Sequence, residues 1–505
     1  MAPSSPTAAA NRARILRFMM DGREVAIEDP PATMTVLEYL REAAGRRGTK
    51  EGCAEGDCGA CTVVVGELDP DRKALRYRAV NSCIRFLATL DGKELVTVES
   101  LRQPSGDLHP VQKSMVDNHG SQCGFCTPGF VMSLFALYLE RDAAQRADVV
   151  DALSGNLCRC TGYRPIIDAG LQQWSYPAPA RWSRADAQSQ THIDALRGLA
   201  REPGEDASLH CPGYHAPRTL DELGAALETN PGALLLAGGT DVGLWSTKQL
   251  RELPHMIYLG DIAELAHIDL SPEELRIGAA VTFSDAWPAL LRLFPALEEQ
   301  AARFASTPIR NSATLCGTLA NGSPIGDSIP ALIALGAQIE LRHGKARRRL
   351  PLEDFYLGYQ VKALGQGEFV SGVAIPAPIE GQMLASFKLS KRIDQDISAV
   401  CATFCVRTED GRVLSARLAY GGMAATPCRA AHAERALEAL GWNEAGLEGA
   451  VAALAQDFKP LSDMRAGSDY RLRTAGALLR RFYLQSRGGT AALRTADALA
   501  GTAYA

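Results

Sequence analysis

The stretch EGCAEGDCGACTVVV, residues 51–65, decides the fold of the first part of the chain. Three cysteines fall within nine positions, and a glycine-rich loop runs directly into an apolar, strand-like segment. Thiolates are the soft, anionic ligands that bind iron–sulfur clusters. Glycines suit such a loop because the backbone can wrap a cluster closely and point N–H groups at sulfur. With a fourth cysteine at Cys83, the stretch predicts a four-thiolate metal site in a small α+β unit.

A second set of four cysteines follows, with the pattern C-x2-C…C-x-C in segments of helical periodicity. The first set reads C-x4-C-x2-C…C, the spacing of a plant-type 2Fe–2S cluster. We therefore predict two 2Fe–2S clusters and electron transfer. Structural zinc sites are the alternative, although zinc favours two C-x2-4-C pairs. The predicted ligands are Cys53, Cys58, Cys61 and Cys83 for the first cluster and Cys123, Cys126, Cys158 and Cys160 for the second.

Composition and charge narrow the class of protein. The 505 residues exceed one domain, and a net charge of −5 gives no reason to expect nucleic acid or an anionic membrane as a partner. No stretch approaches the ~20 apolar residues of a membrane-spanning helix. Thirteen cysteines without an apolar export signal indicate a reducing compartment, and we expect the cytoplasm. We interpret the five cysteines outside the two sets as small buried hydrophobic residues.

Changes of pattern along the chain predict a multidomain α+β protein. The segment 15–28 predicts a hairpin with its turn at Asp21-Gly22, and helices are expected near 429–440 and 471–485. The predicted divisions are a disordered leader (1–14), a ferredoxin-like domain (15–100), a helical cluster domain (101–175), a surface linker (176–212), an α+β domain (213–380), a C-terminal α+β domain (381–485) and a flexible tail (486–505).

A third motif points to a phosphate-bearing ligand. In LLLAGGTDVGL, residues 234–244, the turn Gly238-Gly239-Thr240 follows an apolar strand and can offer N–H groups and a hydroxyl to a pyrophosphate. Alone the motif is weak, because such turns are common and the segment is not G-x-G-x-x-G. A second segment, TPIRNSATLCGTLANGSPIGDSIPAL (307–332), combines small, hydroxyl and acidic residues that could follow a polar ligand.

Together these motifs resemble the iron–sulfur and flavin regions of the molybdenum hydroxylases, the xanthine dehydrogenase and aldehyde oxidase family. EGCAEGDCGACTV, QCGFCTPG and GNLCRCTGYRPI carry the resemblance, which spans about residues 14–485. It implies a β-grasp 2Fe–2S domain, a four-helix-bundle 2Fe–2S domain, an FAD-binding domain of the vanillyl-alcohol-oxidase type over 213–380 and a C-terminal flavoprotein domain. It also implies that Gln122 and Cys160 face a molybdopterin. The implied FAD contacts are Leu236, Ala237, Gly238, Gly239, Thr240, Asp241, Val242, Phe304, Thr314, Thr318, Asp327, Val370 and Lys388.

The resemblance implies a function in electron transfer, with no substrate acid or base in this chain. A purine would be hydroxylated at molybdenum on a large molybdopterin-binding subunit, and electrons would pass through both clusters to FAD and then to NAD. Because the sequence ends where longer family members continue, we expect the small subunit of a split, bacterial-type enzyme, assembled as a dimer of heterodimers. The alternatives are the same role in an aldehyde, nicotinate or carbon monoxide dehydrogenase, and a zinc-stabilised scaffold without flavin.

Overall fold

The computed structural model describes residues 13–201, 208–393 and 395–488, so most of the predicted leader and most of the predicted tail lie outside the described residues. It divides into two compact units. The N-terminal unit runs to Glu264 and includes Ser306–Ala313, and the C-terminal unit comprises Leu265–Ala305 and the residues from Thr314 onwards. This division falls inside the predicted 213–380 domain. The residues expected to contact FAD are therefore distributed over both units, which are described separately below.

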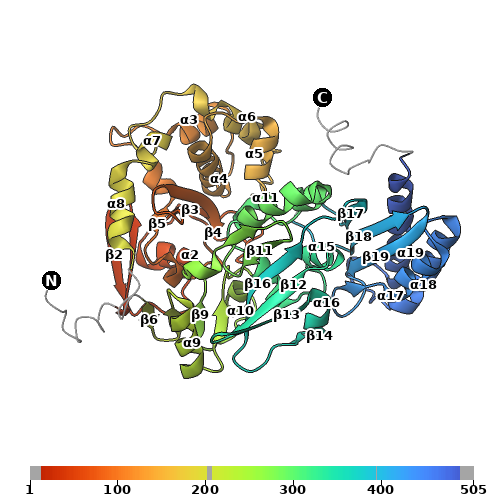
Figure 1. Ribbon diagram of the computed structural model, residues 1–505. Helices are drawn as coiled ribbons and strands as arrows, with labels where there is room; N and C mark the ends of the chain where they lie inside the picture. The colour runs from red at the N-terminus through yellow and green to blue at the C-terminus, as the bar shows by residue number, and fades with distance from the viewer. Residues whose placement is uncertain (1–12, 202–207, 394, 489–505) are drawn as a thin grey trace. The chain divides into compact units, whose positions relative to one another are not determined.

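The N-terminal unit begins with the predicted hairpin. The first sheet consists of β1 (Ile15–Met20), β2 (Arg23–Glu28), β3 (Thr62–Leu68), β4 (Leu75–Asn81) and β5 (Glu94–Val96), with helix α2 (Val36–Glu38) extended by a π-helical turn (Tyr39–Ala43). The strand order is β2-β1-β5-β3-β4, and β1 pairs in parallel with β5. Figure 1 labels β2, β3, β4 and β5 of this sheet. Both Asp21 and Gly22 have positive φ, as a two-residue type I′ turn requires. The predicted hairpin is confirmed.

Four helices form the second part of the N-terminal unit, as expected for the second cluster domain. They are α3 (Pro110–Asp117), α4 (Thr127–Glu140), α5 (Arg146–Ala152) and α6 (Arg164–Gln172). Helix α4 begins directly after Cys126, with Pro128 in its first turn, where a missing N–H costs nothing. Apolar residues from α3, α4, α5 and α6 form one buried core, which explains why α4 is apolar on nearly all sides.

A buried histidine in this core makes the stability of the fold depend on pH. His109 caps α3: its Nδ1 accepts from the backbone N–H of Val111 (3.3 Å) and its Nε2 lies 3.1 Å from the carbonyl of Trp182. Burial lowers the pKa of His109 to about 4, whereas an unfolded histidine titrates near 6.5. The unfolded chain therefore binds the extra proton between these two values. This contribution to stability is complete above pH 6.5 and is lost as the pH falls towards 4.

Lowering the pH from 7 to 5 is therefore expected to destabilise the fold by about 2 kcal/mol through His109 alone, since pH 5 lies about 1.5 units below the unfolded pKa. Urea unfolding of the wild type and of His109→Gln at both pH values measures this contribution. The variant should lose less stability on acidification than the wild type, although it starts from a lower value. Equal losses in the two proteins would assign the acid sensitivity to other groups.

The segment predicted as a linker, 176–212, is instead packed against the first domains. It contains α7 (Arg184–Ala187) and α8 (Gln190–Leu199). Trp182 is fully buried, packs edge-to-face on Tyr77 and Phe135, and donates from its indole N–H to the carbonyl of Ser100 (3.1 Å). The polar composition of the segment conceals these contacts, because only its spaced apolar residues face the core. The described part of the segment thus contributes to the fold, unlike a solvated connector.

The last part of the N-terminal unit carries the predicted glycine turn. Its elements are β6 (Leu209–Cys211), β7 (Tyr214–Ala216), α9 (Leu220–Thr229), β8 (Leu234–Leu236), α10 (Val242–Thr247), β9 (Met256–Tyr258) and α13 (Thr307–Arg310). The sheet order is β6-β7-β9-β8, and β8 pairs in parallel with β9. Buried charges join this sheet to the first domain: Asp91 binds Arg201 (2.6 Å) and Arg218 (3.1 Å). The glycine turn therefore has a fixed position relative to the cluster domains within this unit.

The C-terminal unit begins with a five-stranded antiparallel sheet of order β10-β11-β16-β12-β13 (Figure 1). Its elements are β10 (Ile268–Leu270), β11 (Glu274–Gly278), α11 (Phe283–Leu293), α12 (Glu298–Ala302), α14 (Leu315–Asn321), α15 (Ser328–Ala334), β12 (Gln338–His343), β13 (Ala346–Pro351), α16 (Leu352–Phe355), β14 (Tyr356–Gly358), β15 (Val361–Lys362) and β16 (Phe369–Pro376). Thr314 caps α14 by accepting from the N–H of Gly317 (3.0 Å). The segment TPIRNSATLCG therefore runs into the first turn of α14, which belongs to this unit.

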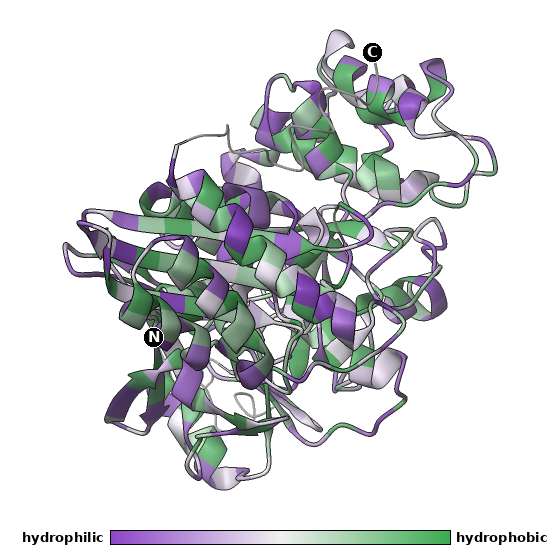
Figure 2. Cartoon of the chain, turned by 90° about the vertical axis from the view of Figure 1, so that its right-hand side faces the viewer, coloured by the Kyte–Doolittle hydropathy of each residue, from purple (hydrophilic) through white to green (hydrophobic). Residues whose placement is uncertain are grey.

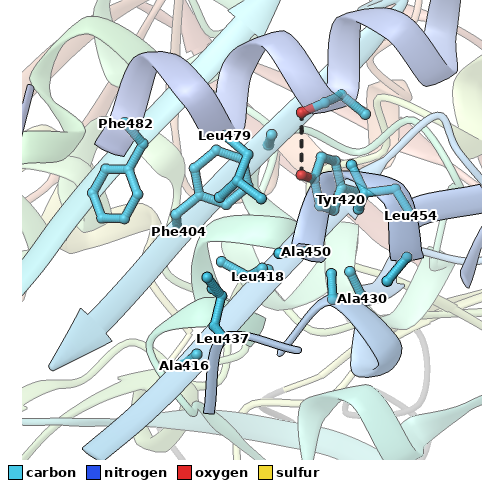
Figure 3. Packing of buried hydrophobic residues seen from close by; sticks show 14 of the residues in the cluster. Phe404, Ala416, Leu418, Tyr420, Ala430, Leu437, Ala450, Leu454, Leu479 and Phe482 are labelled. Carbon is cyan, nitrogen blue, oxygen red and sulfur yellow. Dashed lines mark hydrogen bonds between the residues drawn. The ribbon is translucent and has the colours of Figure 1, made fainter. Parts of the chain in front are cut away.

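A second antiparallel sheet, of order β17-β18-β19-β20, packs against three helices. The elements are β17 (Gln382–Leu389), β18 (Val400–Glu409), β19 (Arg412–Gly421), β20 (Cys428–Arg429), α17 (Ala431–Leu440), α18 (Glu444–Asp457) and α19 (Ser468–Ser486). Figure 3 shows the hydrophobic core that this sheet shares with the three helices, around Phe404 and Tyr420. The Tyr420 hydroxyl donates to the carbonyl of Ala475 (3.3 Å). Hydrophobic and hydrophilic residues alternate along the helices (Figure 2), as amphipathic packing requires. The two predicted helices correspond to α17 and α19.

Candidate iron–sulfur and flavin sites

The loop before β3 is shaped around the sulfur of Cys53. Its Sγ accepts from the backbone N–H groups of Glu55 (3.4 Å), Asp57 (3.4 Å) and Cys58 (3.3 Å). Hydrogen bonds from the side chains of Cys58 and Cys83 and from this backbone hold the pKa of Cys53 well below its usual range. A thiolate is the form that binds metal, so the loop prepares Cys53 as a ligand.

The other three predicted ligands of the first cluster lie beside Cys53. Cys61 and Cys83 are buried with their sulfurs 3.3 Å apart, and Asn81 donates to the Cys61 sulfur at 3.9 Å. Hydrogen bonding from Cys83 lowers the pKa of Cys61. Leu37, Ile84 and Ile309 pack around this pair. The fold therefore brings all four cysteines of the first set together in a partly apolar site that is open at the Cys53–Cys58 side.

The second set of cysteines also converges, at a more exposed site. Cys126 immediately precedes α4, whereas Cys123 and Cys160 are exposed. Side-chain hydrogen bonds pair Cys123 with Cys160 and Cys126 with Cys158. Burial raises the pKa of Cys126 to about 12. Burial also acts to raise the pKa of Cys158, but hydrogen bonds from Thr161, whose hydroxyl lies 3.2 Å from the sulfur, outweigh it and the pKa falls.

The pairing of sulfurs fits a binuclear cluster. In a 2Fe–2S centre the four cysteines divide into two per iron, and the backbone N–H groups aimed at Cys53 are the interactions that tune such a centre. Across the described ranges, no three or more His, Cys, Asp or Glu side chains surround a single metal-ion position. Of the five cysteines outside the two sets, Cys211, Cys316 and Cys401 are buried, as expected, and Cys405 and Cys428 are half-buried.

A direct hydrogen bond connects the two cysteine sets. The backbone N–H of Leu157, next to Cys158, donates to the carbonyl of Cys58 at 3.0 Å. Asn156 reinforces the contact by donating to the carbonyl of Gly59 (3.1 Å). Gly59 has a φ of +68°, and a Cβ there would lie 2.1 Å from the carbonyl oxygen of Gly155. Only glycine fits this position, so the close approach of the two cluster loops depends on it.

The glycine turn in the N-terminal unit has free donors. The backbone N–H groups of Gly238, Gly239 and Thr240 donate to no acceptor among the described residues, and the Thr240 hydroxyl has no partner there. Successive N–H groups of this kind form an anion-binding concavity. Leu236 is buried, Ala237 is half-buried, Asp241 is exposed and Val242 begins α10. The turn is thus suited to a pyrophosphate, as the sequence predicted.

The predicted flavin residues of the C-terminal unit include a buried ion pair. Lys388 Nζ lies 2.7 Å from Asp327 Oδ2, both side chains are less than a tenth exposed, and Ser398 donates to Asp327 Oδ1 at 2.6 Å. The hydroxyl of Ser328, adjacent to Asp327, is buried and has no partner within the described residues. An orphaned donor beside a buried charge is a place where a polar ligand can bind.

The other predicted residues of this unit occupy apolar or capping positions. Phe304 packs on Phe283, with ring centroids 4.3 Å apart. Val370 is buried in β16, and Thr318 is half-buried in α14 beyond the Thr314 cap. Aromatic and aliphatic side chains are the usual lining of a cofactor pocket, so each of these residues is compatible with the predicted flavin contact.

Several residues that shape these sites were not identified from the sequence. Arg303, next to Phe304, is buried and donates to the carbonyl groups of Lys388 (2.7 Å) and Ile393 (2.9 Å). Leu157 and Ile84 each stand beside a predicted cysteine ligand. The sequence offered one signal for Leu157 and Ile84, which is that each is adjacent to a predicted cysteine ligand. The residues that they contact in the fold are distant in the chain, so the contacts themselves could not be predicted.

Four models of known protein families match the chain. The sequence matches the 2Fe-2S iron-sulfur cluster binding domain over residues 18–87, the [2Fe-2S] binding domain over 97–171, the FAD binding domain in molybdopterin dehydrogenase over 207–378 and the CO dehydrogenase flavoprotein C-terminal domain over 385–486. Fold and site together define an iron–sulfur flavoprotein built from two 2Fe–2S domains and an FAD-binding domain. The predicted multidomain α+β fold class is confirmed, and the zinc-scaffold alternative loses its support.

The curated proteins with similar sequences include xanthine dehydrogenases. The chain is 33% identical to xanthine dehydrogenase of Emericella nidulans over 95% of its own length and 40% of that protein, and 32% identical to xanthine dehydrogenase 2 of Arabidopsis thaliana over 87% of its own length and 37% of that protein. The chain belongs to the molybdenum hydroxylase family that includes these xanthine dehydrogenases. It spans about two fifths of the length of these curated relatives.

Solved structures match about half of the chain. Quinoline 2-oxidoreductase from Pseudomonas putida 86 matches with a TM-score of 0.50 and 27% identity, covering 55% of this chain and 96% of that one. Carbon monoxide dehydrogenase from Hydrogenophaga pseudoflava matches with a TM-score of 0.50 and 29% identity, covering 53% and 94%. Within the described residues, none of the helices has the length and apolar character needed to cross a bilayer.

Proposed function

We propose that this chain is the electron-transfer part of a xanthine dehydrogenase. In this proposal a purine such as hypoxanthine or xanthine is hydroxylated at a molybdenum site on a large molybdopterin-binding partner, and NAD is the final acceptor. The family relationship to xanthine dehydrogenases over 95% of the chain supports this choice. When bound, the two clusters supply one-electron transfer, and FAD joins it to the hydride chemistry of NAD.

The observation that carries the proposal is the hydrogen bond from Leu157 N–H to the carbonyl of Cys58. Cys58 belongs to the first set, and Leu157 is bonded directly to Cys158 of the second set. The two cysteines are therefore connected by covalent bonds and this one hydrogen bond of 3.0 Å. This contact holds the two predicted cluster loops together, as electron transfer between two clusters requires. Gly59 and Asn156 serve to keep the two loops this close.

The exposed second set is the side from which electrons would arrive. Cys123 and Cys160 reach the surface, and Phe125 and Leu157 expose apolar area beside them. We assign this side, with Gln122 and Cys160, to the molybdopterin-binding partner. The proposed assembly is a heterodimer that pairs into a heterotetramer, in the cytoplasm. The eight cysteines and the flavin residues predicted from the sequence are the proposed cofactor contacts, and no substrate acid or base is assigned to this chain.

The second candidate is the same role in another molybdenum hydroxylase. The structural likeness to carbon monoxide dehydrogenase and quinoline 2-oxidoreductase, over about half of this chain, favours this alternative. An aldehyde or nicotinate dehydrogenase is equally compatible with the residues of this chain. The substrate pocket of the partner would decide between these candidates.

Substrate and acceptor can be tested with the native complex, purified through a tag on this chain. Under anaerobic conditions, hypoxanthine or xanthine is expected to bleach the visible absorbance, and NAD is expected to restore it while NADH forms. Bleaching by an aldehyde, nicotinate or carbon monoxide, but not by purines, would select the second candidate. Bleaching by purines without recovery on addition of NAD would remove NAD as the acceptor.

A further inference from the structure

Helix α10 packs on the first cysteine set through a residue that has no side chain. Gly243, its second residue, is buried, and a Cβ built there would lie 2.4 Å from the carbonyl oxygen of Ile84 and 2.9 Å from the Ile84 Cβ. Ile84 directly follows Cys83. The carbonyl oxygen belongs to the backbone of Ile84, and the backbone also fixes the position of the Ile84 Cβ. Rotation of the Ile84 side chain therefore cannot relieve the overlap.

The end of α10 is attached to the other part of the same cysteine loop. The Thr247 hydroxyl donates to the carbonyl of Ala54 (2.9 Å), and Lys248 Nζ donates to the carbonyl of Cys53 (3.1 Å). Lys248 also pairs with Glu55 at 3.3 Å. The helix therefore contacts the loop beside Cys53 with one end and the backbone beside Cys83 with the other.

The glycine turn that precedes α10 is confined on its far side as well. A Cβ at Gly238 would lie 2.0 Å from the carbonyl oxygen of Ser312, and Gly239 lies next to Ile84, whose carbonyl oxygen would be 3.9 Å from a Cβ. The N–H of Gly243 donates to the carbonyl of Gly239 (2.7 Å), which ties the turn to the helix. A displacement of α10 must therefore carry the turn with it.

We propose that Gly243 is a positioning residue that sets the separation between the first cluster and the flavin. The inference rests on the proposed function, in which the turn at Gly238–Thr240 holds the FAD pyrophosphate. With glycine at 243, α10 lies against the peptide that follows a cluster ligand. Any larger residue moves α10 and the turn away from Cys83 and lengthens the path for electrons, while the cysteines and the N–H groups of the turn stay intact.

The test compares Gly243→Ala with Gly224→Ala in the holoenzyme. Gly224 lies in helix α9 of the same unit, where an added Cβ meets nothing within 4 Å, and alanine favours a helix. Iron, sulfide and FAD contents are measured first. The flavin is then reduced by a light pulse in the presence of an amine donor, which is oxidised. The decay of cluster absorbance follows the transfer of an electron from reduced flavin to a ferric ion of the cluster.

Gly243→Ala is expected to keep its iron, sulfide and FAD and its cluster potential, but to transfer electrons several-fold more slowly and to show brighter flavin fluorescence. Gly224→Ala should behave as the wild type. A wild-type rate in fully loaded Gly243→Ala would overturn the inference. If Gly243→Ala loses FAD, Thr247→Val decides, because it removes the bond to Ala54 without added bulk: slower transfer supports the inference and an unchanged rate refutes it. A wild type without clusters or FAD would instead refute the proposed function.

Discussion

Replacement of Cys58 by serine is expected to remove about half of the iron and sulfide from the chain, because one of two four-cysteine sites is lost. Serine keeps the size of the side chain but is a hard oxygen ligand that binds such clusters poorly. The Cys58 backbone, which donates to Cys53 and accepts from Leu157, is retained, so the second cluster and FAD should remain. Electron spin resonance of the reduced protein, with iron and sulfide analysis, measures the loss.

Cys428→Ser is the matched control for this variant. Cys428 is half-buried in β20 of the C-terminal unit and belongs to neither cysteine set. Its replacement should leave both cluster signals unchanged. Retention of two cluster signals in Cys58→Ser would contradict the assignment of the first set. Loss of both signals would show that the two sites do not assemble independently.

Replacement of Asp327 by asparagine is expected to lower both FAD content and stability strongly. The ammonium of Lys388 is buried 2.7 Å from Asp327, and the change would leave it without a counter-charge. Breaking a buried pair in this way costs about 3–5 kcal/mol. The bond from Ser398 would lose its charged acceptor as well. Thermal unfolding and the ratio of FAD to protein measure the two effects.

Glu448→Gln provides the control, because it breaks the exposed pair between Arg480 and Glu448 in the same unit. Pairs at the surface contribute little to stability, so its unfolding midpoint and FAD content should match the wild type. If Asp327→Asn unfolds at the wild-type temperature with full FAD, the buried pair is peripheral to the flavin site. A stable variant without FAD would indicate a contact with the flavin and no structural role.

Local sequence patterns predicted those parts of the fold that depend on neighbouring residues. Asp21-Gly22 indicated a turn because few residues adopt positive φ readily. Pro128 after Cys126 indicated a helix start because proline suits the first turn. The spacing of Cys53, Cys58 and Cys61 predicted a ligand loop, because these three cysteines lie within one local turn of the chain. For these features the sequence contained the physical cause.

Contacts between distant residues could not be predicted in the same way. Trp182 lies in a polar segment, and only the tertiary fold shows that it fills the core between Tyr77 and Phe135. The bond between Leu157 and Cys58 depends on how two domains meet. Lys388 was predicted by resemblance as a flavin contact, but its pairing with Asp327 required the position of β17.

The most direct test of the central claim is the cofactor content of the purified chain, measured with its absorption spectrum. We predict a red-brown protein with about four iron, four sulfide and one FAD per chain, and two distinct cluster signals on reduction. Such a result would support the assignment of both cysteine sets and of the flavin residues. A colourless protein that contains zinc and no flavin would contradict the account, because an electron-transfer role would then have no cofactor to support it.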